Sequence, residues 1–222
     1  MSRPSEQDAS GDRRVRPRDP AWDSLWDSVE AAVPERGTGP AGDRGAEAGA
    51  GSAPGESASG GKASSPTPGL KLIVRTDGAA RGNPGPASRG AALIEAAGPA
   101  SRRSDAPPIA TISEYLGIQT NNVAEYTAVV RALALAHELG AREVEMLLDS
   151  KLIVEQLAGR WRVKDAKLIP LHAEAKARLA RFSRWSATHV PRAQNKQADA
   201  LCNEAIDRAQ AGGARVVVIR PK

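Results

Sequence analysis

The stretch LKLIVRTDGAARGNPGP, residues 70–86, decides the fold of this chain. Its first half, LKLIVRTD (70–77), predicts a β-strand, and GAARGNPGP (78–86) predicts a tight loop because Gly and Pro favour turns. The segments RGAALIEAAG (89–98) and IATISEYLGIQT (109–120) predict a second and a third strand. We expect these three strands to form an antiparallel meander.

Beyond this meander the pattern is that of an α/β domain. A helix is predicted from about 122 to 139, and Gly140 provides its C-terminal stop. EVEMLLD (143–149) is almost continuously apolar and predicts a buried central strand. The remaining predicted elements are helices over 150–159, 168–182 and 192–211, a strand over 184–191, and a strand-like segment over 214–222 whose place in the fold stays open.

Composition divides the 222-residue chain into two parts. Residues 1–69 contain 11 Gly and 8 Pro, and such a segment cannot bury enough apolar surface to offset its ordering entropy. We therefore expect a disordered tail ahead of one folded domain over 70–222. Within the tail, residues 20–34 space Trp22 and Trp26 for a short amphipathic helix, which could dock on a protein partner or form only transiently.

Charge divides at the same place. The tail holds 8 Lys and Arg against 11 Asp and Glu, whereas residues 70–222 hold 23 against 15. Such a basic domain favours a nucleic-acid partner, although a generically basic protein is the alternative. Cys202 is the only cysteine, and no apolar run approaches the length of a membrane span. We expect a cytoplasmic, monomeric protein without a membrane segment.

Four carboxylates stand in distinctive short contexts: Asp77 in TDGAARGNPGP, Glu125 in TNNVAEY, Asp149 in LLDSKL and Asp199 in NKQADAL. Oxygen ligands without clusters of His or Cys suit a hard cation such as Mg²⁺. Each has a simpler alternative when taken alone. Asp77 could serve a turn, Glu125 could complete a capping box with Asn122, and Asp149 could cap the helix near Ser150.

Asp199 is harder to explain as a local structural residue. It shares a helix flank with Cys202 and Ile206, which belong to the apolar stripe of the last predicted helix. A charge beside a buried stripe is costly unless it is paired or bound to metal. Asp199 therefore favours a functional interpretation.

Together these contexts resemble the ribonuclease H type 1 (ribonuclease HI) family. The likeness covers residues 71 to 209, and the motifs follow the family order. The matching segments are TDG…GNPGP at 76–86, TNN…E at 120–125, DS at 149–150, and His…Asn…Asp at His189, Asn195 and Asp199. The resemblance implies a ribonuclease H-like mixed five-stranded sheet with flanking helices.

The resemblance also implies a chemistry. Asp77, Glu125, Asp149 and Asp199 would hold two Mg²⁺ ions, or Mn²⁺, for hydrolysis of the RNA strand of RNA/DNA hybrids, which leaves 5′-phosphate and 3′-hydroxyl ends. His189 would assist proton transfer or product departure on a mobile loop. A nucleic-acid-binding module without cleavage and another nuclease of the same superfamily are the alternatives.

Substrate contacts follow from the same resemblance. Gly78 would allow close approach of the RNA backbone, Thr120 would bind a DNA phosphate, and Asn121 and Asn122 would reach the minor groove. Thr and Asn also suit a helix N-terminus, and both uses can coexist. Asn195 belongs to the same set of expected substrate-binding residues.

Two features depart from the family pattern. Lys151 follows the DS pair where the family often has Gln, which favours a phosphate contact over groove reading. The long basic protrusion of well-studied members is replaced by a short connector that contains Arg160, Trp161, Arg162 and Lys164. We expect Trp161 to stack on a sugar, or else to pack within the protein, and the basic side chains to contact phosphates.

Overall fold

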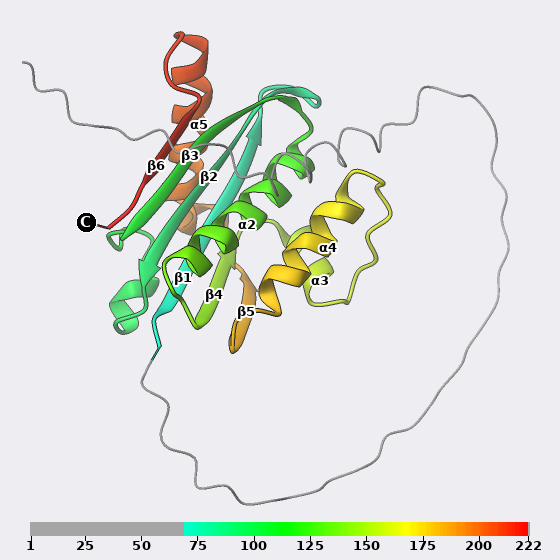
Figure 1. The fold of residues 1–222 in the computed structure, drawn as a ribbon. Coiled ribbons are helices and arrows are strands. Elements are labelled where there is room, and N and C mark those ends of the chain that lie inside the picture. Colours follow the sequence, from blue (N-terminus) through cyan, green and yellow to red (C-terminus); the bar gives the residue numbers. More distant parts are fainter. Residues whose placement is uncertain (1–68, 222) are drawn as a thin grey trace, which may run out of the picture.

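The computed structural model describes residues 69–221 as one mixed sheet with helices on both faces (Figure 1). The predicted helix over 20–34, with Trp22 and Trp26, lies outside the described residues. The strands are β1 (Lys71–Ala80), β2 (Gly85–Glu95), β3 (Ala110–Gln119), β4 (Glu143–Leu148), β5 (Arg184–His189) and β6 (Val216–Ile219). The helices are α2 (Asn121–Glu138), α3 (Lys151–Leu157), α4 (Leu168–Leu179) and α5 (Lys196–Gln210), with 3₁₀ helices η1 (Pro99–Arg102) and η2 (Arg192–Gln194).

The sheet has the strand order β5-β4-β1-β2-β3-β6. The predicted antiparallel meander of β1, β2 and β3 is confirmed, and β4 and β5 add to it in parallel. The expected count of five strands is wrong, because β6 pairs antiparallel with β3 from Thr111↔Ile219 to Glu114↔Val216. VVVI is rich in β-formers, but the sequence pattern does not say which strand it will pair with.

The hairpin between β1 and β2 is tighter than expected. β1 continues to Ala80 and β2 begins at Gly85, so that only residues 81–84 form the turn. The Arg81 amide donates to the Pro86 carbonyl at 2.9 Å and closes it. Asp77 therefore lies inside a strand, opposite Gly90, and the interpretation of Asp77 as a turn residue is wrong.

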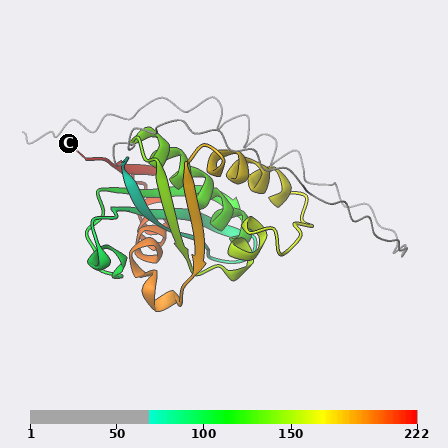
Figure 2. The same ribbon diagram turned by 90° about the horizontal axis from the view of Figure 1, so that it is seen from below.

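The two faces of the sheet carry different layers (Figures 1 and 2). Helix α2 packs on β1 and β2 and is flanked by α4, whereas α5 crosses β1, β2 and β3 on the other face. Side chains alternate along β1, so Leu72 and Val74 join the main core with α2, and Ile73 joins a smaller cluster with Val190. By the same alternation, the side chain of Asp77 lies on the face of the sheet that carries Ile73 and Arg75.

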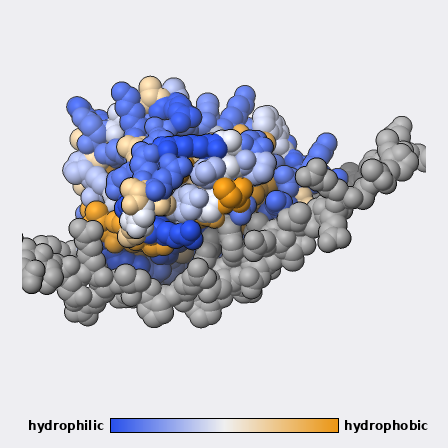
Figure 3. All heavy atoms as spheres, turned by 90° about the horizontal axis from the view of Figure 1, so that it is seen from above, coloured by the Kyte–Doolittle hydropathy of each residue, from blue (hydrophilic) through white to orange (hydrophobic). Residues whose placement is uncertain are grey.

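Polar side chains dominate the described surface that is visible in Figure 3, with smaller hydrophobic areas between them. No helix within residues 69–221 has the length and hydropathy needed to cross a membrane. The fold thus places its apolar side chains between the sheet and its helices, and it leaves the loops at the strand ends free to carry polar groups.

Candidate active site

Asp77 lies at the centre of the candidate site and is almost fully buried. Its Oδ1 accepts a hydrogen bond from the Gly78 amide at 2.9 Å, whereas its buried Oδ2 has no partner. The pKa of Asp77 is raised to about 7, first by burial and then by the charges of Asp149, Asp199 and Glu125, against the opposing effect of Arg192. The four predicted carboxylates are therefore close enough to influence one another.

The parallel pairing of β1 and β4 brings Asp149 to Asp77. Thr76 pairs with Leu148, and Asp149 follows β4 directly. The fully buried Asn195 joins the two strand ends, because its amide nitrogen donates to the Thr76 carbonyl and to Asp149 Oδ1, each at 2.8 Å. Asn195, expected as a substrate-binding residue, thus has a direct role in holding Asp149.

Glu125 enters the site from α2. Thr120 is the N-cap of this helix and accepts from the Val123 amide at 3.4 Å, so the capping-box interpretation of Glu125 is wrong. Glu125 Oε1 instead accepts from Asn121 Nδ2 at 2.9 Å. Burial raises the pKa of Glu125; hydrogen bonds from Ser150 and Asn121 partly offset this increase, and the Asp149 charge adds to it.

Gly78 allows α2 to approach β1 closely. It is buried, and a Cβ added there would lie 2.0 Å from the Glu125 amide nitrogen and 2.3 Å from the Ala124 carbonyl carbon. A side chain would displace the start of α2 and move Glu125 with it. The structure thus gives a reason for glycine other than the predicted approach of an RNA backbone, which stays a prediction.

Asp199 occupies the first turn of α5, with 30% of its side chain exposed. Arg192, in η2, donates to Asp199 Oδ1, and Asn203 Nδ2 donates to Asp199 Oδ2 at 3.3 Å. Motif comparison missed Arg192 as a site residue. The available signal was its position in the quoted HVPRAQN segment, seven residues before Asp199, but the sequence did not predict that its side chain would fold back.

His189 is the last residue of β5, and it pairs in register with Leu148, next to Asp149. The expected place on a mobile loop is therefore wrong, because the parallel pairing with β4 continues to this residue. Its side chain is exposed, and the pKa of Glu155 on α3 is lowered chiefly by the hydrogen bond from Arg160, with the His189 charge as a smaller contribution. His189 therefore lies at the edge of the site, beside α3.

The predicted substrate residues surround this group on exposed segments. Asn122 is the exposed second residue of α2, after the N-cap Thr120 and Asn121, and Lys151 is the exposed first residue of α3. Trp161 is 46% exposed, so the alternative of a packed Trp161 is not supported. Arg160 pairs with Glu155, whereas the side chains of Arg162 and Lys164 are exposed on the same connector.

The carboxylates fit a divalent cation by their chemistry. Within residues 69–221 no three His, Cys, Asp or Glu side chains already adopt the arrangement of a metal site. However, Asp77 Oδ2 is a buried acceptor without a donor, and the pKa of Asp77 is raised first by burial and then by three neighbouring carboxylates. A hard cation would supply both the missing partner and the missing positive charge.

Known proteins resemble the same part of the chain. The family model described as reverse transcriptase-like matches residues 75–205. Ribonuclease HI of Halobacterium salinarum is 41% identical over 144 residues, which cover 65% of this chain and 68% of that protein. The bifunctional protein Rv2228c of Mycobacterium tuberculosis is also 41% identical over 145 residues, but the chain spans only 38% of its length.

Solved structures of ribonuclease H proteins also resemble this part of the chain. The N-terminal RNase H domain of Rv2228c has a TM-score of 0.56 at 42% identity, over 62% of this chain and 99% of that one. LC11-RNase H1, solved in complex with an RNA/DNA hybrid, has a TM-score of 0.56 at 39% identity, over 63% of this chain and 99% of that one. With the fold, the order of the motifs and these relatives in agreement, the chain belongs to the ribonuclease H type 1 family.

Proposed function

We propose that this protein is an endonuclease that hydrolyses the RNA strand of RNA/DNA hybrids and leaves 5′-phosphate and 3′-hydroxyl ends. One observation carries the proposal: the fold gathers four carboxylates from separate elements around Asp77, whose buried Oδ2 lacks a partner. Acidic groups in a domain with an excess of basic residues would oppose binding of a phosphate unless cations were present. The domain architecture proposed is a catalytic unit over 70–222 that follows the tail.

Asp77, Glu125, Asp149 and Asp199 would hold two divalent cations, Mg²⁺ or Mn²⁺. When bound, such ions supply an activated water and neutralise charge on the phosphate and the leaving oxygen. The raised pKa of Asp77, caused first by burial and then by the charges of the other three carboxylates, supports this assignment, because a bound cation would stabilise the ionised groups.

Neighbouring side chains would position the carboxylates, balance their charge and assist proton transfer. Asn195 holds the Asp149 carboxylate in place, and Asn121 does the same for Glu125. Arg192 provides a positive charge at Asp199 that a cation could replace. His189, exposed at the end of β5, would assist proton transfer to the leaving oxygen or departure of the product.

Recognition of the hybrid is proposed for exposed groups around the site. Thr120, Asn122 and Lys151 lie at the starts of α2 and α3, where backbone amides also point outward. Trp161, Arg162 and Lys164 would contact the backbone from the connector. The relative LC11-RNase H1 was solved with an RNA/DNA hybrid, which supports this class of substrate.

Strand-specific cleavage tests the proposal. The full chain with Mg²⁺ should cut end-labelled RNA in a hybrid, spare the paired DNA strand and spare duplex DNA of the same sequence. The products should be extended by a polymerase without prior removal of a 3′-phosphate. If the protein binds the hybrid but cuts it with neither Mg²⁺ nor Mn²⁺, the domain is a binding module and the proposal fails.

Cellular context also remains a proposal. We propose a cytoplasmic location, because a chain with one Cys cannot form an internal disulfide, and we propose a monomeric state. A protein partner for the segment around Trp22 and Trp26 is proposed from its sequence pattern alone.

A further inference from the structure

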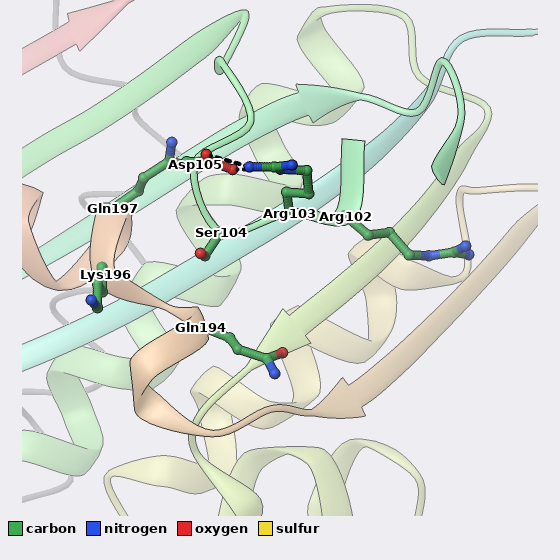
Figure 4. A pocket seen from close by; sticks show the side chains of 7 residues that line it. All are labelled: Arg102, Arg103, Ser104, Asp105, Gln194, Lys196 and Gln197. Atoms are coloured by element: carbon green, nitrogen blue, oxygen red, sulfur yellow. Dashed lines mark hydrogen bonds and ion pairs between the residues drawn. The ribbon is translucent and has the colours of Figure 1, made fainter. Parts of the chain in front are cut away.

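A cavity of about 750 Å³ opens beside the candidate active site, between the β2–β3 connection and the start of α5 (Figure 4). One wall comes from the connection around η1, and the other from the end of η2 and the first turn of α5. Three cations, one carboxylate and three neutral polar groups line it: Arg102, Arg103, Lys196, Asp105, Ser104, Gln194 and Gln197.

The two walls are joined by a buried cation. Arg75, only 1% exposed in β1, donates from Nη1 to the Gln194 carbonyl at 2.5 Å and from Nη2 to the Arg102 carbonyl at 2.6 Å. A second link runs from Gln197 Nε2 to the Ala106 carbonyl at 2.9 Å. These bonds fix the separation of the walls, so the cavity is a preformed feature of the fold.

The charge inside the cavity is not balanced. Arg102 turns away from the other labelled side chains in Figure 4 and makes a bidentate pair with Glu145 at 2.8 Å. Arg103 pairs with Asp105 at 2.9 Å. Lys196 is exposed and makes no ion pair with any residue in the described part of the chain. A net positive charge therefore remains on the wall formed by α5.

The position of Lys196 relates the cavity to the acidic group. Lys196 precedes Asp199 by three residues on α5, so the two side chains lie within one helical turn. Gln194, on the same wall, directly precedes Asn195, which holds Asp149. A group bound in the cavity would thus lie next to a phosphate bound at the carboxylates.

We propose that this cavity binds a phosphate of the RNA strand close to the scissile one. Lys196 would supply the charge, and the Gln194 amide and the Ser104 hydroxyl would donate hydrogen bonds. This inference rests on the proposed function, because it takes the carboxylates as the place where the scissile phosphate binds. It assigns part of hybrid binding to the β2–β3 connection, in addition to the short basic connector after α3.

Binding measurements separate this role from others. In an Asp77→Asn background with Mg²⁺, Lys196→Gln should weaken binding of a labelled hybrid about three- to tenfold and lower the slope of log Kd against log salt by about 0.9. Arg181→Gln removes an exposed charge beyond the end of α4 and serves as the matched control, with slope and Kd unchanged. An unchanged slope for Lys196→Gln would overturn the proposal.

Replacement of single RNA phosphates by neutral methylphosphonates provides a test on the substrate. One position near the cleavage site should reproduce the loss seen with Lys196→Gln, and the two changes together should cost no more than either alone. Full additivity at every position would contradict the assignment. Cleavage by the wild type is scored separately: if cleavage is absent while the coupling is present, the proposed function fails and the phosphate site stands.

Discussion

Asp77→Asn should stabilise the metal-free protein at neutral and alkaline pH. The substitution keeps the size of the side chain and its acceptor for the Gly78 amide, and it removes a charge that is 5% exposed and surrounded by carboxylates. Because the unpartnered Oδ2 accepts no hydrogen bond, an amide group there loses no existing contact. The folded protein should therefore gain free energy of unfolding even though the same change removes a proposed metal ligand.

The size of the gain follows from the pKa. Folding raises the pKa of Asp77 from 3.8 to about 7, so between these values the folded state retains a proton that the unfolded state has lost. The free energy of unfolding of the wild type then decreases as pH rises from about 4 to 7. Above pH 7 the whole free-energy cost of keeping Asp77 ionised in the folded state is present. Three pKa units at about 1.4 kcal/mol each set an upper limit of about 4 kcal/mol for the advantage of Asp77→Asn.

Urea unfolding in EDTA, repeated from pH 4 to pH 9, measures this difference. The advantage of Asp77→Asn should be near zero at pH 4, grow through pH 5 and 6, and level off above pH 7. Saturating Mg²⁺ should reduce or reverse it, since the cation stabilises only the wild-type cluster fully. Asp105→Asn is the control, because pairing with Arg103 lowers the pKa of Asp105 and no gain with pH is expected. A difference that is flat with pH would refute the reasoning.

Three further changes test other parts of the site. Arg192→Gln removes the guanidinium paired with Asp199, so calorimetry should find tighter Mg²⁺ binding. Weaker binding would contradict the view that Arg192 and Mg²⁺ compete for Asp199. Gly78→Ala should destabilise the domain by about 1–3 kcal/mol in urea, because its Cβ would overlap the Glu125 backbone, and a neutral effect would contradict this packing. Deletion of residues 1–69 should leave hydrolysis and the urea midpoint largely unchanged, and a loss of folding would show that the domain extends into the tail.

The sequence predicted most of the sheet because its strands are marked by local features. Apolar runs and the GNPGP turn placed β1 and β2, and the nearly continuous apolar segment of β4 predicted its central position. The strand-like segment over 214–222 is confirmed as β6, but its place was not predicted, because a short run of Val and Ile has no local feature that selects β3 as its partner. The pairing of β6 depends on where α5 ends relative to the sheet, and that position is a property of the whole fold.

The site also contains residues that local sequence motifs predicted and residues that only the folded structure reveals. Motif contexts named the four carboxylates, and the electrostatic coupling around Asp77 is consistent with their proposed grouping. The roles of Arg192 and Arg75 were not predicted, since both depend on side chains that meet residues distant in sequence or fold back from a loop. The capping-box alternative for Glu125 took Asn122 as the N-cap, whereas the N-cap is Thr120, two residues earlier.

Cleavage of a hybrid as a function of Mg²⁺ tests whether the four carboxylates form a metal-dependent nuclease site. The full-length wild type, Asp77→Asn and Asp165→Asn, an exposed acid on the connector before α4, are compared on one labelled RNA/DNA hybrid. We expect RNA cleavage by the wild type and by Asp165→Asn to rise with Mg²⁺ and to disappear in EDTA, and we expect no cleavage by a folded Asp77→Asn. Undiminished cleavage by Asp77→Asn, or cleavage by the wild type in EDTA, would contradict a metal-dependent site at these carboxylates.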